Sequence, residues 1–169
     1  GDSAVHQQRY SMGTMFDVIA YHESRPVAER AVDEALDEIE RLDRVMSHFK
    51  ADSDLSRLNR EAGNRSVQVD PDLYDVIRQS IEVSRLSAGT FDVTVAPLVR
   101  MWKKAHDDGR APLPEEITTA RRCVGYDKVD LEGSDRIRFR CDCLEIELGG
   151  IGKGYAVDRV AAILRQAGI

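Results

Sequence analysis

Residues 26–46 read PVAERAVDEALDEIERLDRVM, and this stretch decides how the rest of the chain is arranged. Its apolar residues recur every three or four positions, which is typical of a helix that buries one face. Pro26 suits the first turn, where its missing N–H costs no hydrogen bond, and Glu29 favours the positive end of the helix dipole. The residues expected on the buried face are Ala28, Ala31, Val32, Ala35, Leu36, Ile39, Leu42 and Met46.

Shorter periodic segments lie on both sides of this helix. Upstream, residues 10–21 alternate apolar and polar side chains, which predicts a strand. Downstream, Asp70 and Pro71 form an N-cap with proline at the first helical position, and the helix they begin is expected to end near Gly89. Further helices are expected at residues 55–60 (capped by Ser53 or Asp54), 114–122 and 152–166, with a brief strand at 67–69.

Three alternating runs in the second half of the chain predict strands at residues 128–131, 136–140 and 144–148. Turn residues between the first two runs predict a hairpin. In the last helix, the residues expected to face inward are Val157, Val160, Ala161 and Leu164. Helices and antiparallel strands in this order predict an α+β fold, with an antiparallel or mixed sheet packed with helices.

The composition excludes several classes of protein. The chain has 169 residues, a mass of 18.9 kDa and a formal net charge of −6. Its length alone suggests one domain, since domains commonly hold about 100–200 residues. The acidic balance argues against a general nucleic-acid binder, which needs clustered Lys and Arg. No apolar run reaches the roughly 20 residues that span a bilayer. No basic and then apolar leader opens the sequence, so we expect any targeting segment to lie outside it.

The three cysteines give a weaker signal. If two of Cys123, Cys141 and Cys143 form a disulfide, one thiol stays free. Cys141 and Cys143 stand two apart in an expected strand, where alternate side chains share one face. A zinc site would need a fourth ligand, and no histidine is nearby in the sequence. We therefore expect small core side chains rather than metal ligands, and the disulfide state stays open.

Two segments in the first half of the chain carry candidate functional residues. Residues 11–16 read SMGTMF; a glycine ahead of a strand permits close approach of a ligand, but an ordinary bulge is the expected role. Residues 46–59 are dense in polar side chains, as in a capped turn. Phe49 stands out there as an aromatic ring suited to stacking on a flat ligand. The sequence assigns His48 no partner, so we expect it at the surface.

A third segment lies near the middle of the chain. Residues 91–99 read FDVTVAPLV, and Pro97 is expected to begin a helix. Free backbone N–H groups at such a start can bind a ring edge or a phosphate. Asp92 can serve that site or act as a cap, and Trp102 is expected in the core. The residues just ahead of the proline are Thr94, Val95 and Ala96.

A glycine-rich turn between an expected strand and an expected helix is the fourth segment. Residues 147–158 read ELGGIGKGYAVD. A Walker A loop is excluded because Glu147 stands at its first glycine position and Gly154 follows the lysine. A dinucleotide fingerprint is excluded because Tyr155 stands where glycine or alanine is needed. What remains is an anion site at a helix N-terminus, with Lys153 as the cation.

The four segments together resemble one family closely, the ApbE-type FAD:protein FMN transferases, also described as thiamine-biosynthesis lipoproteins. The matching stretches are residues 12–14, 46–47 with 53–59, 91–99 and 149–158. The resemblance implies an ApbE-like (T-fold-like) fold, with residues 1–169 as its N-terminal portion. It also implies a magnesium-dependent enzyme that cleaves FAD, transfers FMN through a phosphoester bond to a threonine or serine of a partner protein, and releases AMP.

The resemblance further implies roles for single residues. The backbone carbonyl of Gly150 would bind magnesium. The family pattern continues beyond Ile169 with a second glycine pair, a His-x-x-Asp-Pro-x-x-Gly segment and an Asp-Ala-x-Ser/Thr-Thr segment. Those segments carry the catalytic histidine and the side-chain magnesium ligands, so we expect an N-terminal half that binds magnesium poorly and transfers nothing alone. The implied FAD contacts are Met12, Phe49 (usually tyrosine or another aromatic in the family), Thr94, Val95, Ala96, Glu147 and Lys153.

Two other functions stay open beside the transferase. One is a FAD pyrophosphatase that uses water as the acceptor, and the other is a non-catalytic module for flavin binding or partner docking. The expected partner of a transferase is an acceptor flavoprotein with a threonine or serine site, and no nucleic acid. The resemblance also implies export, in the periplasm or on the inner membrane, where membrane contact runs only through a lipid anchor that this sequence does not include.

Overall fold

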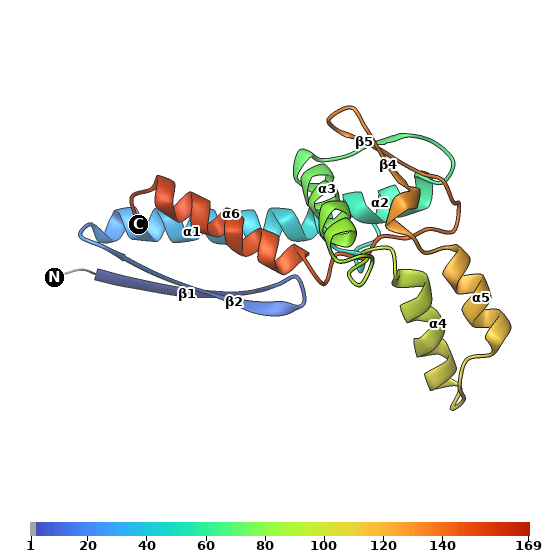
Figure 1. Ribbon diagram of the computed structural model, residues 1–169. Coiled ribbons are helices and arrows are strands. Elements are labelled where there is room, and N and C mark those ends of the chain that lie inside the picture. Colours follow the sequence, from blue (N-terminus) through green and yellow to red (C-terminus); the bar gives the residue numbers. More distant parts are fainter. Residues whose placement is uncertain (1–2) are drawn as a thin grey trace.

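The computed structural model describes residues 3–169 as an elongated molecule with a long arm and a broader head (Figure 1). The arm contains a two-stranded hairpin, the first helix and the last helix, and the head contains the elements between them. Helices combined with small antiparallel sheets confirm the predicted α+β class. In chain order the elements are β1 (Ser3–Ser11), β2 (Thr14–His22), α1 (Arg25–Met46), α2 (Asp54–Glu61), β3 (Val67–Gln68), α3 (Pro71–Leu86), α4 (Ala96–Asp107), α5 (Pro114–Arg122), a 3-10 turn (Tyr126–Lys128), β4 (Val129–Glu132), β5 (Arg136–Phe139) and α6 (Gly152–Gln166).

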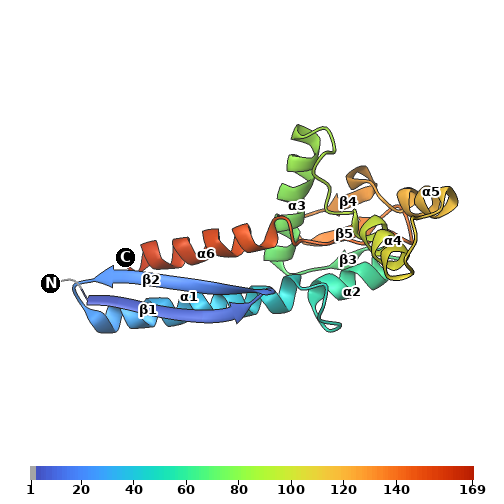
Figure 2. The ribbon, with the colours of Figure 1, turned by 90° about the horizontal axis from the view of Figure 1, so that it is seen from below.

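Helix α1 is the axis of the arm, and its predicted apolar face is buried. Helix α6 runs alongside it in the opposite direction, and the β1–β2 hairpin lies against another side of the same helix (Figures 1 and 2). Leu36, Ile39 and Leu42 are fully buried among these elements. The core of the arm is therefore built around the stretch that the sequence singles out.

Helix α6 buries a narrower stripe than the sequence predicts. Ala156 and Val160 are buried, whereas Val157 is 54% exposed. Neighbouring residues lie roughly 100° apart around a helix, so Ala156 and Val157 cannot both face α1. The prediction is confirmed for Val160 and wrong for Val157, while Ala161 and Leu164 are half-buried.

The two strands of the arm pair as an antiparallel hairpin with a two-residue turn at Met12 and Gly13. Both turn residues have a positive φ, 51° at Met12 and 75° at Gly13, which suits the twist of a tight hairpin. The predicted bulge at Gly13 is therefore wrong, and the predicted strand corresponds to β2. Strand β1 escaped prediction because its inner face includes polar contacts, such as Arg9 Nη1 donating to Glu40 Oε1 at 2.7 Å.

The head holds a three-stranded antiparallel sheet in the order β3–β5–β4, and the pairing of β4 with β5 confirms the predicted hairpin. The third predicted strand is wrong, because residues 144–148 join no ladder within the part of the chain that is described. This segment bonds instead to a side chain and a loop. Ile146 exchanges two hydrogen bonds with the Asn59 amide, and Glu147 N–H donates to Val93 O at 2.8 Å.

Helix boundaries in the head agree with the sequence. Ser53 caps α2, where its hydroxyl oxygen accepts from the N–H of Ser56 at 3.0 Å. Asp70 caps α3 in the same way, with Oδ1 accepting from the N–H of Asp72 at 2.9 Å. Gly89 follows α3 in a left-handed conformation, with a φ of 79°. Local signals therefore predicted these ends correctly.

Helices α4 and α5 project from the head and pack against each other (Figure 1). Trp102 on α4 is 54% exposed, so the prediction of a core residue is wrong. The expectation that the cysteines are core side chains is wrong for Cys141, which is half-buried, and for Cys143, which is exposed. Cys123 is buried, but it forms a disulfide with the exposed Cys143. Cys141 and Cys143 lie in a turn after β5 rather than in a strand.

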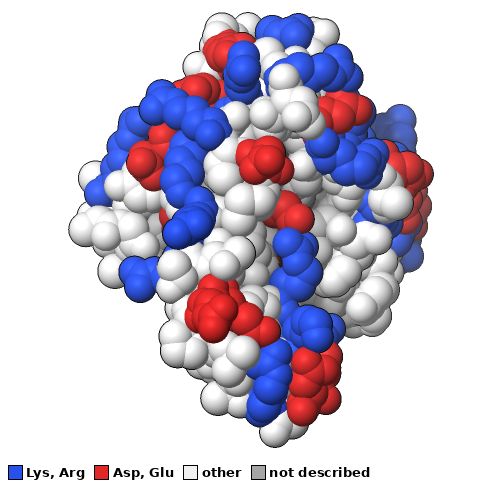
Figure 3. Space-filling view, turned by 90° about the vertical axis from the view of Figure 1, so that its right-hand side faces the viewer, with Lys and Arg blue, Asp and Glu red and all other residues white. Residues whose placement is uncertain are grey.

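The surface adds two observations. Among residues 3–169, no helix combines the length and the apolar character that a bilayer crossing requires. On the face shown in Figure 3, Lys and Arg side chains alternate with Asp and Glu side chains.

Candidate functional site

A hollow of about 270 Å³, called the first hollow below, lies where the arm meets the head. Segments that are far apart in the sequence line it: the hairpin turn, the end of α1 with the loop after it, the turn before α6, and the first turn of α6. Four predicted FAD contacts meet here, namely Met12, Phe49, Glu147 and Lys153. The other lining residues are Gly13, Asp43, Met46, Ser47, His48, Leu148, Gly149 and Gly152.

Met12 reaches the first hollow because the hairpin turn forces it there. Its positive φ is uncommon for a residue other than glycine, and such conformations concentrate at functional sites. The side chain is half-buried and lies over the start of α6, where a Cβ added to Gly152 would come within 3.4 Å of Met12 Cε. The hairpin turn and the start of α6 are therefore in close contact through Met12 and Gly152.

The loop after α1 presents Phe49 to the same hollow. Phe49 N–H donates to the Ser47 hydroxyl oxygen at 3.2 Å, and the Ser53 hydroxyl donates to the Ser47 carbonyl at 2.5 Å. These bonds fix the loop, yet the Phe49 side chain is 84% exposed. An aromatic ring held by an ordered loop and left in solvent is a ready stacking surface.

His48 has a partner that the sequence did not assign. Its Nδ1 atom lies 3.6 Å from Glu147 Oε1, and its ring centroid lies 3.8 Å from that of Phe49. The prediction of a surface residue is confirmed, because His48 is exposed. The contact with Glu147 nevertheless joins the loop after α1 to the glycine-rich turn across the rim of the hollow.

The glycine-rich turn before α6 is fixed by its own hydrogen bonds. Glu147 Oε1 accepts from the N–H of Gly149 at 2.6 Å, and Lys153 Nζ donates to the Gly149 carbonyl at 3.2 Å. A Cβ at position 149 would overlap Glu147 Oε1, so a side chain there would displace the Glu147 carboxylate from the Gly149 N–H. In the described chain α6 begins with no side-chain cap. The Gly152 N–H donates to the Leu148 carbonyl, and the N–H groups of Lys153 and Gly154 can serve a ligand.

The remaining predicted FAD contacts, Thr94, Val95 and Ala96, lie in the segment that leads into α4, and their surroundings differ. Asp92 Oδ1 accepts from both the N–H and the hydroxyl of Thr94, and the Thr94 hydroxyl in turn accepts from the N–H of Gly125 at 2.8 Å. Thr94 is therefore buried and holds the loop together. Val95 is half-buried at the cap position of α4. Ala96 reaches a different cavity from the first hollow.

That cavity, called the second hollow below, has a volume of about 640 Å³. It shares His48, Phe49 and Glu147 with the first hollow, so these three residues form a ridge between the two. Five of the seven predicted FAD contacts therefore line one of the two hollows, whereas Thr94 and Val95 line neither. The residues that line only the second hollow are Ala51, Ser56, Asn59, Arg60, Ala96, Val99, Arg100, Lys103, Glu145 and Ile146.

Asn59 is a positioning residue to which the sequence assigned no role. Its Nδ2 donates to Ile146 O and its Oδ1 accepts from Ile146 N–H, both at 2.9 Å. The amide replaces a neighbouring strand for the segment that leads to Glu147. The two residues are 87 positions apart, so no local pattern could have revealed the contact.

An ion-pair network behind the first hollow ties α6 to α1 and α3. Tyr155 Oη donates to Asp72 Oδ1 at 2.7 Å, and Arg41 bonds to both Asp72 and Glu38. Burial alone would raise the pKa of Asp72, but the bonds from Tyr155 and Arg41 lower it below its usual value. The Arg41 bond lowers the pKa of Glu38 as well. Burial raises the pKa of Tyr155, so its hydroxyl keeps its proton.

Comparison with known proteins identifies the relatives of this architecture. The model of the ApbE family matches residues 12–169. A FAD:protein FMN transferase from Vibrio cholerae is 29% identical over 169 residues, covering 98% of this chain and 50% of that protein. One from Haemophilus influenzae is 32% identical over 127 residues, covering 72% of this chain and 37% of that protein. The chain spans about half the length of the curated relatives it matches.

Solved structures give the same result. The flavin transferase ApbE from Vibrio cholerae superposes with a TM-score of 0.87 at 28% identity, covering all of this chain and 55% of that one. An ApbE protein from Thermotoga maritima superposes with a TM-score of 0.85 at 26% identity, covering 98% of this chain and 53% of that one. These matches confirm the predicted ApbE-like fold over the described residues.

Proposed function

We propose that this chain, which belongs to the ApbE family, supplies the FAD-binding part of a FAD:protein FMN transferase. The observation that carries the proposal is the exposed Phe49 ring beside a hollow that also holds Lys153 and the uncapped start of α6. A free aromatic face suits a flat ring system, and a cation at a helix N-terminus suits phosphate. FAD combines both groups in one molecule.

Each part of FAD then meets residues whose chemistry fits it. Phe49 stacks on the flavin ring, and the thioether of Met12 packs beside it, as sulfur does on aromatic edges. The Lys153 side chain and the N–H groups of Lys153 and Gly154 hold the pyrophosphate. Glu147 keeps the Gly149 N–H and His48 in position rather than facing the phosphates.

The segment before α4 contributes from the other side of the ridge. Thr94 is fully buried and bonded to Asp92 and Gly125, so it serves the site by holding this segment in place. Val95 and Ala96 stand at the start of α4, which also lacks a side-chain cap in the described chain. Backbone N–H groups at this start suit the polar edge of a flavin ring, as they suit other acceptors.

A magnesium site fits this chain in part. Magnesium prefers six oxygen ligands in octahedral geometry, commonly carboxylates, carbonyls and water. Gly150 is exposed at the turn and offers its backbone carbonyl, whereas the Glu147 carboxylate is bonded to Gly149. We assign the other magnesium ligands and the catalytic histidine to residues beyond Ile169. When bound, magnesium supplies charge neutralisation at the pyrophosphate. Alone, this chain should bind magnesium weakly and transfer nothing.

The proposal includes an acceptor and a location. The acceptor is a flavoprotein with a threonine or serine that takes FMN as a phosphoester while AMP leaves. The protein is exported, in the periplasm or on the inner membrane, and a lipid anchor outside these residues provides any membrane contact. Nucleic acid has no part in the reaction.

A product analysis on the full-length protein tests this function. The protein is incubated with FAD, magnesium and a threonine-bearing acceptor, and both AMP and covalently bound flavin are measured. We expect the two products in equal amounts. AMP without labelled acceptor would support a FAD pyrophosphatase, and neither product would support a non-catalytic binding module.

A matched pair of lysine variants ties that reaction to the first hollow. Lys153→Gln removes the cation beside the uncapped helix start, so AMP release at a fixed FAD concentration should fall strongly. Lys104→Gln removes an exposed lysine on α4 that pairs with Asp108, and should leave AMP release unchanged. Equal rates for the two variants would contradict the role assigned to Lys153.

A further inference from the structure

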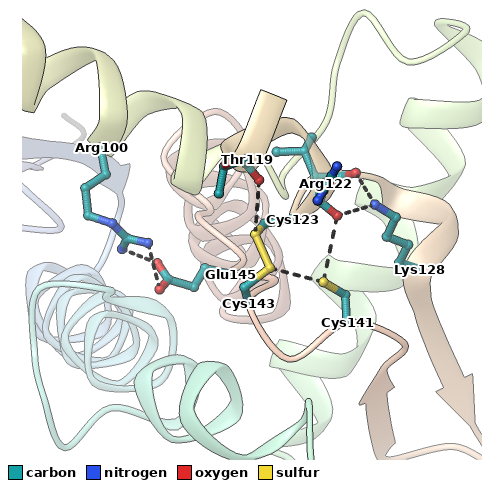
Figure 4. Close-up of a disulfide and its surroundings, with 9 residues drawn as sticks. Arg100, Thr119, Arg122, Cys123, Lys128, Cys141, Cys143 and Glu145 are labelled. Carbon is teal, nitrogen blue, oxygen red and sulfur yellow. Dashed lines mark hydrogen bonds and ion pairs between the residues drawn. A yellow bond between two sulfur atoms is a disulfide. The ribbon is translucent and has the colours of Figure 1, made fainter. Parts of the chain in front are cut away.

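The three cysteines form a cluster outside the flavin site, at the point where α5 meets the turn after β5 (Figure 4). Cys123 ends α5 and is joined to Cys143 by a disulfide. Cys141 is the free cysteine among residues 3–169, and its Sγ lies 3.2 Å from Cys143 Sγ. The third sulfur is therefore in direct contact with the disulfide.

The surrounding backbone holds this arrangement in place. A Cβ on Gly63 would lie 2.7 Å from Asp142 Cα, so the turn that carries Cys141 and Cys143 is pressed against α2 and the residues after it. The Arg122 carbonyl lies 3.8 Å from Cys141 Sγ, within reach of its thiol proton. The sulfur of the free thiol is therefore fixed beside the disulfide by two segments.

The position of each sulfur suits a different role. Cys143 is exposed and Cys141 is half-buried, so the attacking sulfur and the sulfur under attack both reach solvent. Cys123 is buried, and its Sγ lies 3.7 Å from the Thr119 carbonyl. That carbonyl can accept an S–H bond from Cys123 once the disulfide has opened.

A metal site is a weaker interpretation of the same cluster. All three sulfurs lie within 4.8 Å of one another, which would suit a thiophilic metal ion. The disulfide, however, occupies two of the three sulfurs, and thiolate ligation requires both to be reduced. The disulfide and the adjacent free thiol are instead the two reactants of a thiol–disulfide exchange.

We propose that Cys141 is the nucleophile of an internal thiol–disulfide exchange. Cys141 gives its proton to solvent and the thiolate attacks Cys143 Sγ. A Cys141–Cys143 bond forms, the Cys123–Cys143 bond breaks, and Cys123 leaves as a thiolate that takes a proton from solvent. The step needs no oxidant or reductant, because one disulfide and one thiol are present before and after it.

The exchange changes what the disulfide holds. In the Cys123–Cys143 form, the bond ties α5 to the residues just ahead of Leu144, where the segment that leads to Glu147 begins. In the Cys141–Cys143 form, the bond closes within one turn and no longer restrains α5. The ion pair between Arg100 and Glu145, at 2.5 Å, remains as a link from α4 to this segment. The cluster thus sets how firmly the projecting α4–α5 pair is attached.

Disulfide mapping on the full-length protein tests the exchange. The protein is held near pH 8 for increasing times, acidified, treated with a thiol-blocking reagent and digested with trypsin. Cleavage after Arg122 and Arg140 places Cys123 in one peptide and both other cysteines in another. The starting form therefore gives two linked peptides, and exchange releases a separate Cys123 peptide that carries the blocking group.

We expect the released Cys123 peptide to increase with time at a rate independent of protein concentration. Raising the pH from about 7 to about 8 should speed release by up to about tenfold, because the thiolate is the attacking species. A Cys141→Ser variant should lose the release while keeping the linked pair, and circular dichroism should show an unchanged fold. Cys141→Ala provides a second variant with the same expectation.

Three results would overturn this inference. The first is a wild-type protein that stays linked through Cys143 at every time and pH. The second is release at the same rate in Cys141→Ser, which would assign the attack to another thiol. The third is a Cys123–Cys141 link, recognised after cleavage ahead of Asp142, which would place the attack on the other sulfur. The test is independent of flavin binding.

Discussion

The buried stripe of α1 and the ridge just beyond its end differ sharply in how their side chains are used. Leu36 and Ile39 are fully buried in the core of the arm, whereas Phe49 is 84% exposed. The buried side chains of the stripe stabilise the fold, whereas the apolar ring of Phe49 on the ridge stays in water. Stability and ligand binding should therefore respond to different substitutions within a few turns of one helix.

The largest effect on stability should come from the stripe. Leu36→Ala removes a fully buried side chain, and such changes cost about 2–5 kcal/mol. Urea denaturation followed by circular dichroism measures the loss. Leu86→Ala is the matched control, because Leu86 is 82% exposed and should lose little. Equal losses for the two variants would contradict the assignment of α1 as the core axis.

Asn59 supports the segment that leads to the ridge, and its substitution should give the next largest loss of stability. Asn59→Ala leaves the N–H and carbonyl of Ile146 without their partner, which costs about 1–3 kcal/mol for a buried polar group. FAD binding should weaken as well, because the segment that positions Glu147 loses its support. Asn64→Ala, at an exposed turn, is the control. A variant with lower stability and unchanged FAD affinity would separate Asn59 from the site.

These long-range contacts explain which parts of the structure the sequence could predict. The α1 stripe and the Ser53 and Asp70 caps depend on neighbours within a few residues, so their patterns were readable. Strand β1 was missed because Arg9 finds its partner on α1. Residues 144–148 alternate as a strand does, but the Asn59 amide takes the place of a paired strand.

The candidate site shows the same division. Its glycine-rich turn and the exposed Phe49 were recognisable from residue type and order, and their resemblance to one family located them together. The contact of His48 with Glu147 was not recognisable, because it joins residues about 100 positions apart in the chain. Burial of Thr94 was also hidden, since its partner Gly125 comes from a separate loop.

Acid should weaken the ion-pair network that attaches α6 to α1 and α3, whereas the apolar packing of the α1 stripe contains no group that takes up a proton. The pKa values of Glu38 and Asp72 are lowered in the folded protein, so the unfolded chain binds more protons as the pH falls. Their contribution is therefore present above their ordinary pKa values near 4 and is lost below them. Thermal melts between about pH 6 and pH 3 should show a falling Tm.

Asp72→Asn provides the control for the acid effect. The variant cannot lose a charge at position 72, so its Tm should fall less steeply over the same pH range. Its Tm near pH 7 should already be lower, because Arg41 and Tyr155 keep a weaker partner. A variant with the same acid slope as the natural sequence would show that the network does not govern the transition.

The smallest effect on stability should come from the ridge itself. Phe49→Ala removes a side chain that is mostly in solvent, and such surface changes usually stay within about 0.5 kcal/mol. Denaturation under the conditions used for Leu36→Ala measures it. A loss as large as that of a core leucine would mean that Phe49 supports the fold and is not kept free for a ligand.

The most direct test of the flavin site is the FAD affinity of the full-length protein, measured by fluorescence titration for Phe49→Ala and Tyr21→Ala. Tyr21 is a matched control, because it is 63% exposed on the outer face of the hairpin. Loss of stacking should weaken FAD binding by up to about tenfold in Phe49→Ala, since aromatic pairs contribute about 0.5–1.5 kcal/mol. Tyr21→Ala should bind FAD as the natural sequence does. Unchanged affinity in Phe49→Ala, or an equal loss in both variants, would contradict the site.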